Sequence, residues 1–258
     1  PALLLLLAMP FSSASAVIGA QALAIVPLLF WSRGIHAKGP VAAVPPPEVK
    51  AVREVIREFA AFGVALPLGY LVSWVLSTSD RYLVAHFMTT EDVGIYAMNY
   101  GFWSLPYLML NAWLEILTRP RIYQKASKGD WRGMRYILAG RIGLAFGLGL
   151  VGSVLLMLIG EDLSISILGQ KYQTDWGVPT CIGIAHLCLI VGYAASPAFL
   201  ATKKMNVILY STLTAAITNL VLNLLLIPQL GLLGAALSTL AAYFLWATIV
   251  VILAVGYT

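Results

Sequence analysis

The chain has 258 residues, of which 60% are hydrophobic and 10% charged, and its formal net charge is +5. Its mean hydropathy is +0.87. A soluble domain is about half apolar and a quarter charged, so this composition excludes an ordinary soluble protein and predicts an all-α polytopic membrane bundle.

The first charge-free interval runs from Pro1 to Ser32 and is broken near Pro10 to Ser15. We expect the tail of one helix followed by a complete transmembrane span at 16–32. The Leu-rich start and the small residues before Val17 also fit a signal peptide, but there is no initiating Met and no basic n-region. A fragment of a longer protein is the simpler interpretation.

Residues 33–58 form the longest polar segment. Pro40 and the triplet Pro45–Pro47 favour an extended linker. From Glu48 to Phe59 the apolar residues fall on one helical face, which predicts an amphipathic helix on the membrane interface.

The remaining charge-free intervals predict six further spans, because a helix needs about 20 apolar residues to cross the hydrocarbon core. Pro228 and Gly231 divide the last interval into two helices. With the first span this gives about seven complete transmembrane helices, at residues 16–32, 59–87, 93–118, 136–159, 177–201, 206–227 and 231–256.

The positive charges separate by side. Segments 33–58, 119–135 and 203–204 fall on one side of the bilayer and hold thirteen of the 16 Lys and Arg residues. The positive-inside rule makes this side cytoplasmic. The net charge is therefore a sign of topology and implies no nucleic-acid partner.

Polar residues recur every three or four positions along the span 93–118, which places them on one helical face. They are Tyr100, Ser104, Tyr107, Asn111, Glu115 and Thr118. Polar groups in hydrocarbon are costly, so this polar stripe predicts the lining of a wet cavity. Mutual hydrogen bonding in a tight bundle, with Glu115 near the cytoplasmic interface, is the alternative.

Three other charges lie in or at the ends of spans. Asp80 and Arg81 come near the outer end of 59–87, where an interfacial position is the alternative to a functional one. Arg141 lies inside 136–159 and either binds an anionic substrate or extends back to the cytoplasmic face. Asn219 and Asn223 are explained by hydrogen bonds between helices.

Motifs for chemistry are lacking. Gly147–Gly152 matches a dinucleotide-binding pattern, but it lies inside a span without the preceding strand, and with Gly143 it predicts a small-residue packing face. Cys181 and Cys188 have no metal or redox spacing. No P-loop, catalytic triad or metal cluster occurs, so we expect no cofactor, no metal and no enzyme activity.

Four stretches carry a family resemblance. Ser79–Leu83 with Asp92–Tyr96 resembles the "DR…GxY" segment of bacterial polysaccharide flippases, and Thr218–Asn223 with Ile227–Ala236 resembles their C-terminal "N…LN…IP…G…GAA" signature. Gly169–Tyr172 and Leu200–Lys204 are similar to shorter elements of the same proteins. Over residues 50–258 the chain thus resembles the O-antigen and polysaccharide flippases of the multidrug/oligosaccharidyl-lipid/polysaccharide exporter superfamily.

The resemblance implies a fold of two six-helix lobes around a central cavity. It makes residues 1–32 the end of the N-terminal lobe, 33–58 the cytoplasmic linker and 59–258 the second lobe. The implied function is to flip a polyprenyl-diphosphate-linked oligosaccharide across the bacterial cytoplasmic membrane by alternating access, with the polysaccharide assembly machinery as a possible partner. Arg81, Tyr100, Ser104, Tyr107, Asn111 and Arg141 are the expected substrate-binding residues, and Asp80 and Glu115 the expected ion-coupling residues.

Two other functions stay open. A cation-coupled drug exporter of the same superfamily predicts an apolar, aromatic cavity with a buried acid and no need for arginine. A membrane glycosyl ligase or polymerase predicts a large outer loop with catalytic residues, and the predicted outer loops are short.

Overall fold

The computed structural model describes residues 49–257, with side chains from Leu68 onward. The chain divides into two compact units, Pro1–Val55 and Ile56–Thr258. The helix tail, the span at 16–32 and most of the linker at 33–58 lie outside the described residues. The fold below is that of the second unit.

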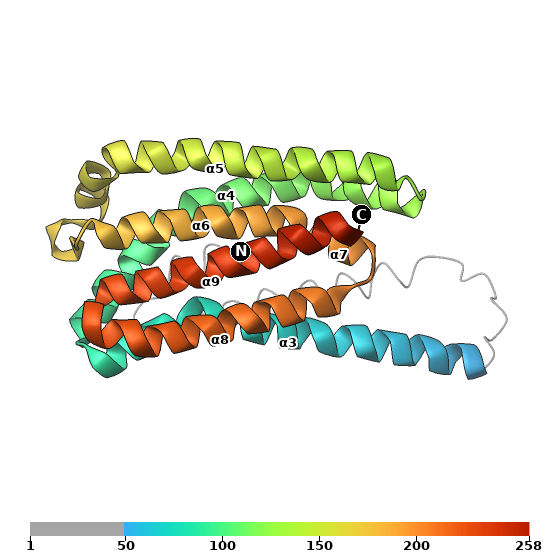
Figure 1. Cartoon of the computed structure of the whole chain (residues 1–258), viewed down its shortest axis with the longest axis horizontal. Helices are drawn as coiled ribbons and strands as arrows, with labels where there is room; N and C mark the ends of the chain where they lie inside the picture. Colours follow the sequence, from blue (N-terminus) through green and yellow to red (C-terminus); the bar gives the residue numbers. More distant parts are fainter. Residues whose placement is uncertain (1–48, 258) are drawn as a thin grey trace, which may run out of the picture. The chain divides into compact units, whose positions relative to one another are not determined.

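The described residues form helices and no strands, which confirms the all-α prediction (Figure 1). In chain order the elements are α3 (Val49–Phe87), α4 (Thr90–Ser127), α5 (Trp131–Leu168), the short 3₁₀ turn η1 (Gln170–Tyr172), α6 (Gly177–Ala195), α7 (Pro197–Ala201), α8 (Met205–Leu230) and α9 (Leu232–Tyr257).

Helix α3 is continuous from Val49 to Phe87. It therefore joins the predicted interfacial helix and the predicted span at 59–87 without a break. Helix α4 begins at a capping box, in which the side chain of Thr89 accepts from the backbone N–H of Asp92 and the Asp92 carboxylate accepts from that of Thr89. These bonds satisfy donors that a helix start leaves unpaired, and they close the turn from α3.

The break between α8 and α9 lies where the sequence predicts it, but α8 ends just before Gly231 and not at Pro228. Pro228 is contained in α8, which ends only at Leu230. Gly231 then takes a positive φ of 57°, a conformation that glycine adopts without steric cost. One turn earlier, the missing N–H of Pro228 shortens the hydrogen-bond ladder of α8 without ending it.

Four helical segments within the described residues are long and apolar enough to cross a membrane. They are Trp131–Leu168, Gly177–Ala201, Met205–Leu230 and Leu232–Tyr257. Helix α4 is long enough but is not among them, because its many Tyr, Trp, Asn and Ser residues lower its mean hydropathy. The structure thus supports a multi-span membrane protein and does not confirm a count of seven.

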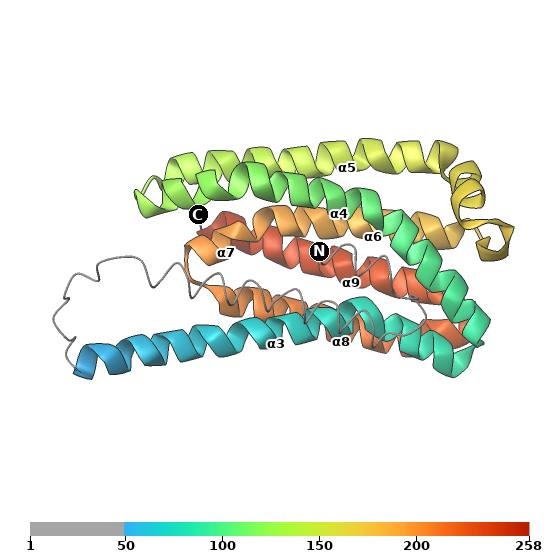
Figure 2. The same ribbon diagram turned by 180° about the vertical axis from the view of Figure 1, so that it is seen from behind.

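Helix α6 is the most enclosed of these segments. In its most apolar window 67% of the residues are buried, compared with 17% for α5. Figures 1 and 2 show α6 and α9 crossing between a layer of α4 and α5 on one side and α3 and α8 on the other. Gly192 permits the close approach of α6 to α9, because an added Cβ would overlap the ring of Trp246 and lie 3.2 Å from the Cα of Ala247.

The expected small-residue face of α5 is only partly present. Gly149 packs closely against the side chains of Leu187 and Ile190 on α6. At Gly143, Gly147 and Gly152 an added Cβ would have no neighbouring atom within 4 Å. The prediction was therefore wrong for these three positions, since they lie on the outer side of a helix that contacts α6 along a single face.

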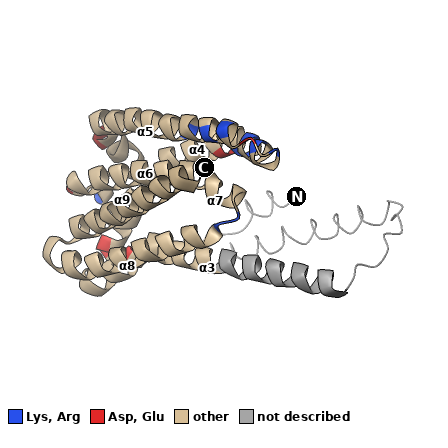
Figure 3. Cartoon of the chain, turned by 45° about the vertical axis from the view of Figure 1, so that its right-hand side comes forward, with Lys and Arg blue, Asp and Glu red and all other residues tan. Residues whose placement is uncertain are grey.

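Basic residues gather at one end of the second unit, at the turn from α4 to α5 and at the segment from α7 to α8 (Figure 3). Arg81 lies near the end of α3 and Lys171 in η1, both toward the opposite end (Figure 1). This separation agrees with the predicted alternation of the loops. The assignment of the basic end to the cytoplasm stays a prediction.

Candidate functional site

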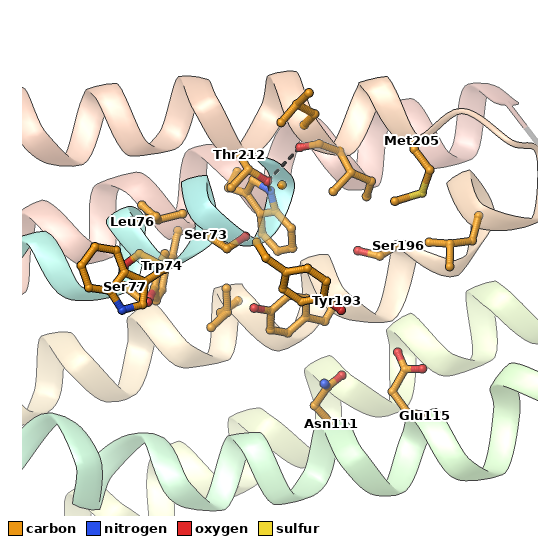
Figure 4. Close-up of a pocket in the computed structure, with 18 of the residues that line it drawn as sticks. Ser73, Trp74, Leu76, Ser77, Asn111, Glu115, Tyr193, Ser196, Met205 and Thr212 are labelled. Carbon is orange, nitrogen blue, oxygen red and sulfur yellow. Dashed lines mark hydrogen bonds between the residues drawn. The ribbon is translucent and has the colours of Figure 1, made fainter. Parts of the chain in front are cut away.

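A cavity of about 620 Å³ lies among α3, α4, α6, α8 and α9. Among the described residues, its lining combines aromatic rings, aliphatic side chains, hydroxyl groups, one amide and one pair of opposite charges (Figure 4). The lining residues are Gly69, Tyr70, Ser73, Trp74, Leu76, Ser77, Asn111, Glu115, Arg119, Leu189, Tyr193, Ser196, Leu200, Met205, Ile208, Leu209, Thr212, Tyr243 and Trp246.

The cavity has a closed side and an exposed side. Tyr243 and Trp246 on α9 are buried, and the indole N–H of Trp246 donates to Thr212 at 3.1 Å. Tyr70 and Trp74 on α3 are 76% and 52% exposed. Within the second unit, α3 therefore forms the more exposed side of the cavity lining.

Glu115 is the acid of the cavity lining, and two arginines pair with it. Its Oε1 accepts from the guanidinium of Arg141 on α5. Its Oε2 lies 3.1 Å from Nε of Arg119, one turn further along α4. A buried carboxylate is costly unless it is paired, and these two contacts give the Glu115 carboxylate its partners inside the bundle.

Arg141 is enclosed by three helices. The residue is 1% exposed, and besides Glu115 its guanidinium donates to Thr118 Oγ1 at 3.2 Å and to the backbone carbonyl of Tyr193 on α6 at 3.3 Å. The side chain therefore ends inside the protein instead of extending to the membrane surface. It joins α4, α5 and α6 and is not part of the cavity lining.

Asn111 is the second polar residue that α4 presents to the cavity, one turn from Glu115 (Figure 4). Its Oδ1 is buried and has no hydrogen-bond partner within the described part of the chain. An unpaired buried acceptor costs about 1–3 kcal/mol. This oxygen is therefore available to a ligand or a water molecule in the cavity.

The rest of the polar stripe lies within the bundle, outside the cavity lining. The hydroxyl of Tyr100 shares a hydrogen bond of 2.6 Å with that of Tyr243, and the hydroxyl of Tyr107 one of 2.8 Å with Ser153. Ser104 donates to the carbonyl of Gly101 on its own helix. Asn111 and Glu115 of the stripe thus line the cavity, whereas Tyr100, Ser104 and Tyr107 form hydrogen bonds within the bundle.

Asp80 and Arg81 form a second polar group near the other end of the bundle. Asp80 is 1% exposed and accepts from the hydroxyl of Tyr96 at 2.9 Å. Arg81 lies 3.8 Å from the Asp80 carboxylate and donates to the carbonyl of Ser77, with its guanidinium carbon 4.6 Å from the centre of the Tyr100 ring. Neither residue lines the cavity. Their roles in binding and coupling stay predictions.

Asn219 and Asn223 are fully buried on α8. Asn219 accepts from Ser79 on α3 at 3.2 Å, which provides the expected bond between helices, and from Asn223 on its own helix at 2.9 Å. Within the described residues no group of three His, Cys, Asp or Glu side chains is placed to hold a metal ion.

The sequence did not single out Arg119 or the aromatic lining. Arg119 counted among the basic residues of a cytoplasmic loop, whereas α4 continues past it to Ser127. Its position four residues after Glu115 was the available signal, because residues four apart are neighbours on a helix. Tyr193 and Trp246 gave no signal, since aromatic residues in a span usually pack in the core.

A bundle of long apolar helices around a partly polar cavity defines the chain as a multi-span α-helical membrane protein. Residues 3–129 match the family model described as "Polysaccharide biosynthesis protein". The match is consistent with a polysaccharide flippase family member, which is the family that the sequence resembles. It includes the motif at 79–96, while the C-terminal motifs lie beyond it. No curated protein and no solved structure matches the chain.

Proposed function

We propose that this protein is part of a flippase that moves a polyprenyl-diphosphate-linked oligosaccharide across the bacterial cytoplasmic membrane by alternating access. The observation that carries the proposal is the cavity of about 620 Å³, which has mixed polar and aromatic walls inside an apolar bundle. The family match indicates a role in polysaccharide synthesis or export. A cavity of this kind suits carriage of a polar substrate past lipid better than a catalytic role.

Each part of the substrate has a counterpart in the lining. Sugar rings stack on aromatic faces and their hydroxyls form hydrogen bonds, which Trp74, Tyr193 and Asn111 can provide. A diphosphate needs a positive group, and Arg119 is the basic residue of the described lining. In the proposed function the polyprenyl chain remains in the bilayer on the more exposed α3 side while its head group enters the cavity.

Asp80 and Glu115 are the proposed ion-coupling residues. Asp80 is the more enclosed of the two, at 1% exposure, and has one hydrogen bond from Tyr96 and one ion pair with Arg81. A buried carboxylate with a removable partner changes its interactions when a cation or proton arrives. Coupling through Asp80 therefore places the ion outside the cavity that holds the substrate.

A gene-deletion experiment tests the proposal. We expect a strain without the gene for this protein to lose its surface polysaccharide and to accumulate the lipid-linked precursor in the inner leaflet, and the complete gene to restore both. Unchanged surface polysaccharide in the deletion strain would contradict the proposal. Loss of polysaccharide with no precursor synthesis would point to an earlier biosynthetic step.

The aromatic lining favours a second candidate, a cation-coupled drug exporter. Five rings face the cavity, those of Tyr70, Trp74, Tyr193, Tyr243 and Trp246, and Glu115 would serve as the acid that such an exporter needs. The two candidates differ in their dependence on arginine. Increased drug sensitivity of the deletion strain with intact surface glycans would select the exporter.

A further inference from the structure

The two arginines that share Glu115 differ in what they can reach. Arg119 lines the cavity, and its side chain is 48% exposed. Arg141 lies behind Glu115 with a fully buried side chain and three acceptors around its guanidinium. A substrate in the cavity can therefore touch Arg119 directly, and it can sense Arg141 only through Glu115.

The charges of this triad do not cancel. Two guanidinium groups and one carboxylate leave one positive charge, and among the described residues Glu115 and Arg119 are the only charged groups of the lining. Charges interact more strongly in an apolar bundle than in water, so this single charge attracts an anion into the cavity.

Arg141 also controls how firmly Glu115 holds Arg119. The Glu115 carboxylate divides its two oxygens between the arginines, Oε1 to Arg141 and Oε2 to Arg119. An arriving anion competes with Oε2 for Arg119. Because Arg141 neutralises Glu115 from behind, Arg119 can leave Oε2 without leaving an unpaired carboxylate in the protein.

We propose that Arg119 is the residue that contacts the anionic group of the substrate, and that Arg141 is a positioning residue that acts through Glu115. This inference rests on the proposed function for the substrate class, a polyprenyl diphosphate. It assigns Arg119 a role that the sequence had given to Arg81 or Arg141. Arg141 then sets the affinity of the site without contact with the ligand.

Binding to the purified full-length protein tests the assignment, with polyprenyl diphosphate as the probe and polyprenol without phosphate as the uncharged comparison. Trp74 and Trp246 line the cavity, so tryptophan fluorescence reports binding. We expect Arg119→Gln to weaken diphosphate binding about tenfold or more, as loss of a charge-assisted hydrogen bond does. Binding of the polyprenol should not change.

Arg121→Gln is the matched control, because it removes the same charge two residues away at an exposed position outside the lining. We expect this variant to bind as the wild type does. Equal binding by the wild type and by Arg119→Gln would overturn the role of Arg119. Wild-type protein that binds no polyprenyl diphosphate would instead refute the proposed function.

The role of Arg141 is tested by rescue. Arg141→Met leaves Glu115 and Arg119 with zero net charge, so we expect weak diphosphate binding. Adding Glu115→Gln to that variant restores one positive charge, and we expect binding to recover. Because the double variant is also expected to regain stability, both variants are compared at equal amounts of folded protein, checked by circular dichroism. Binding to the folded fraction that is equally weak in Arg141→Met and in the double variant, or undiminished in Arg141→Met, would overturn the positioning role.

Discussion

The buried pair of Glu115 and Arg141 makes a strong prediction about stability. Removing one partner of a buried ion pair costs about 3–5 kcal/mol, because the other charge is left without compensation. Glu115 is 24% exposed and keeps its contact with Arg119. We therefore expect Arg141→Met to destabilise the protein by about 3 kcal/mol, at the lower end of that range.

A double-mutant cycle in detergent micelles measures this effect. The free energy of unfolding is obtained by titration with a denaturing detergent and followed by circular dichroism. Replacing a buried ion pair by apolar or neutral residues is often neutral, so we expect Arg141→Met with Glu115→Gln to lie within about 1 kcal/mol of the wild type. A single variant as stable as the wild type, or a double variant no more stable than the single, would refute the reasoning.

Three further predictions concern packing, hydrogen bonding and pH. Gly192→Ala should destabilise the protein by about 1–3 kcal/mol through overpacking, whereas Gly147→Ala, with open space at its Cβ, should not; thermal unfolding compares the two. Tyr96→Phe should lower the free energy of unfolding by about 1–3 kcal/mol because the Asp80 carboxylate loses its hydrogen bond from Tyr96. In the same denaturation assay we expect this loss to be smaller than the loss caused by Asp80→Asn. The pKa of Asp130 lies below its usual value because Lys125 and a backbone N–H donate to the carboxylate. The ionised carboxylate therefore stabilises the fold at neutral pH, and this contribution is lost as the pH falls below about 4. A pH dependence of stability that is the same in the wild type and in Asp130→Asn would contradict this prediction.

The positions of the helices could be predicted from the sequence because the physics of the bilayer acts on long stretches of chain. Charge-free intervals and clusters of arginine identify the membrane spans and their orientation even where the helix propensity of single residues is misleading. The ends of the helices could not be predicted as well. Helix α4 extends past the apolar interval to Ser127, and just beyond its end the Asp130 carboxylate lies 2.7 Å from Nζ of Lys125.

The candidate site was predictable in part. Asn111 and Glu115 could be identified because polar residues within a membrane span are costly and therefore rare, and both line the cavity. Tyr100 and Tyr107 belong to the same stripe, yet their partners come from α9 and α5. Which members of a stripe face a cavity depends on where the neighbouring helices stand, and that is a property of the tertiary packing alone.

The most direct test of the proposed function is a transport measurement in vesicles. The purified full-length protein is reconstituted into liposomes that carry a fluorescent polyprenyl-diphosphate oligosaccharide, and a membrane-impermeant quencher reports which leaflet holds the label. We predict that the wild type raises the fraction of label exchanged between leaflets well above that of protein-free liposomes, and that Arg119→Gln lowers the rate about tenfold. Exchange no faster than in protein-free liposomes would contradict the account.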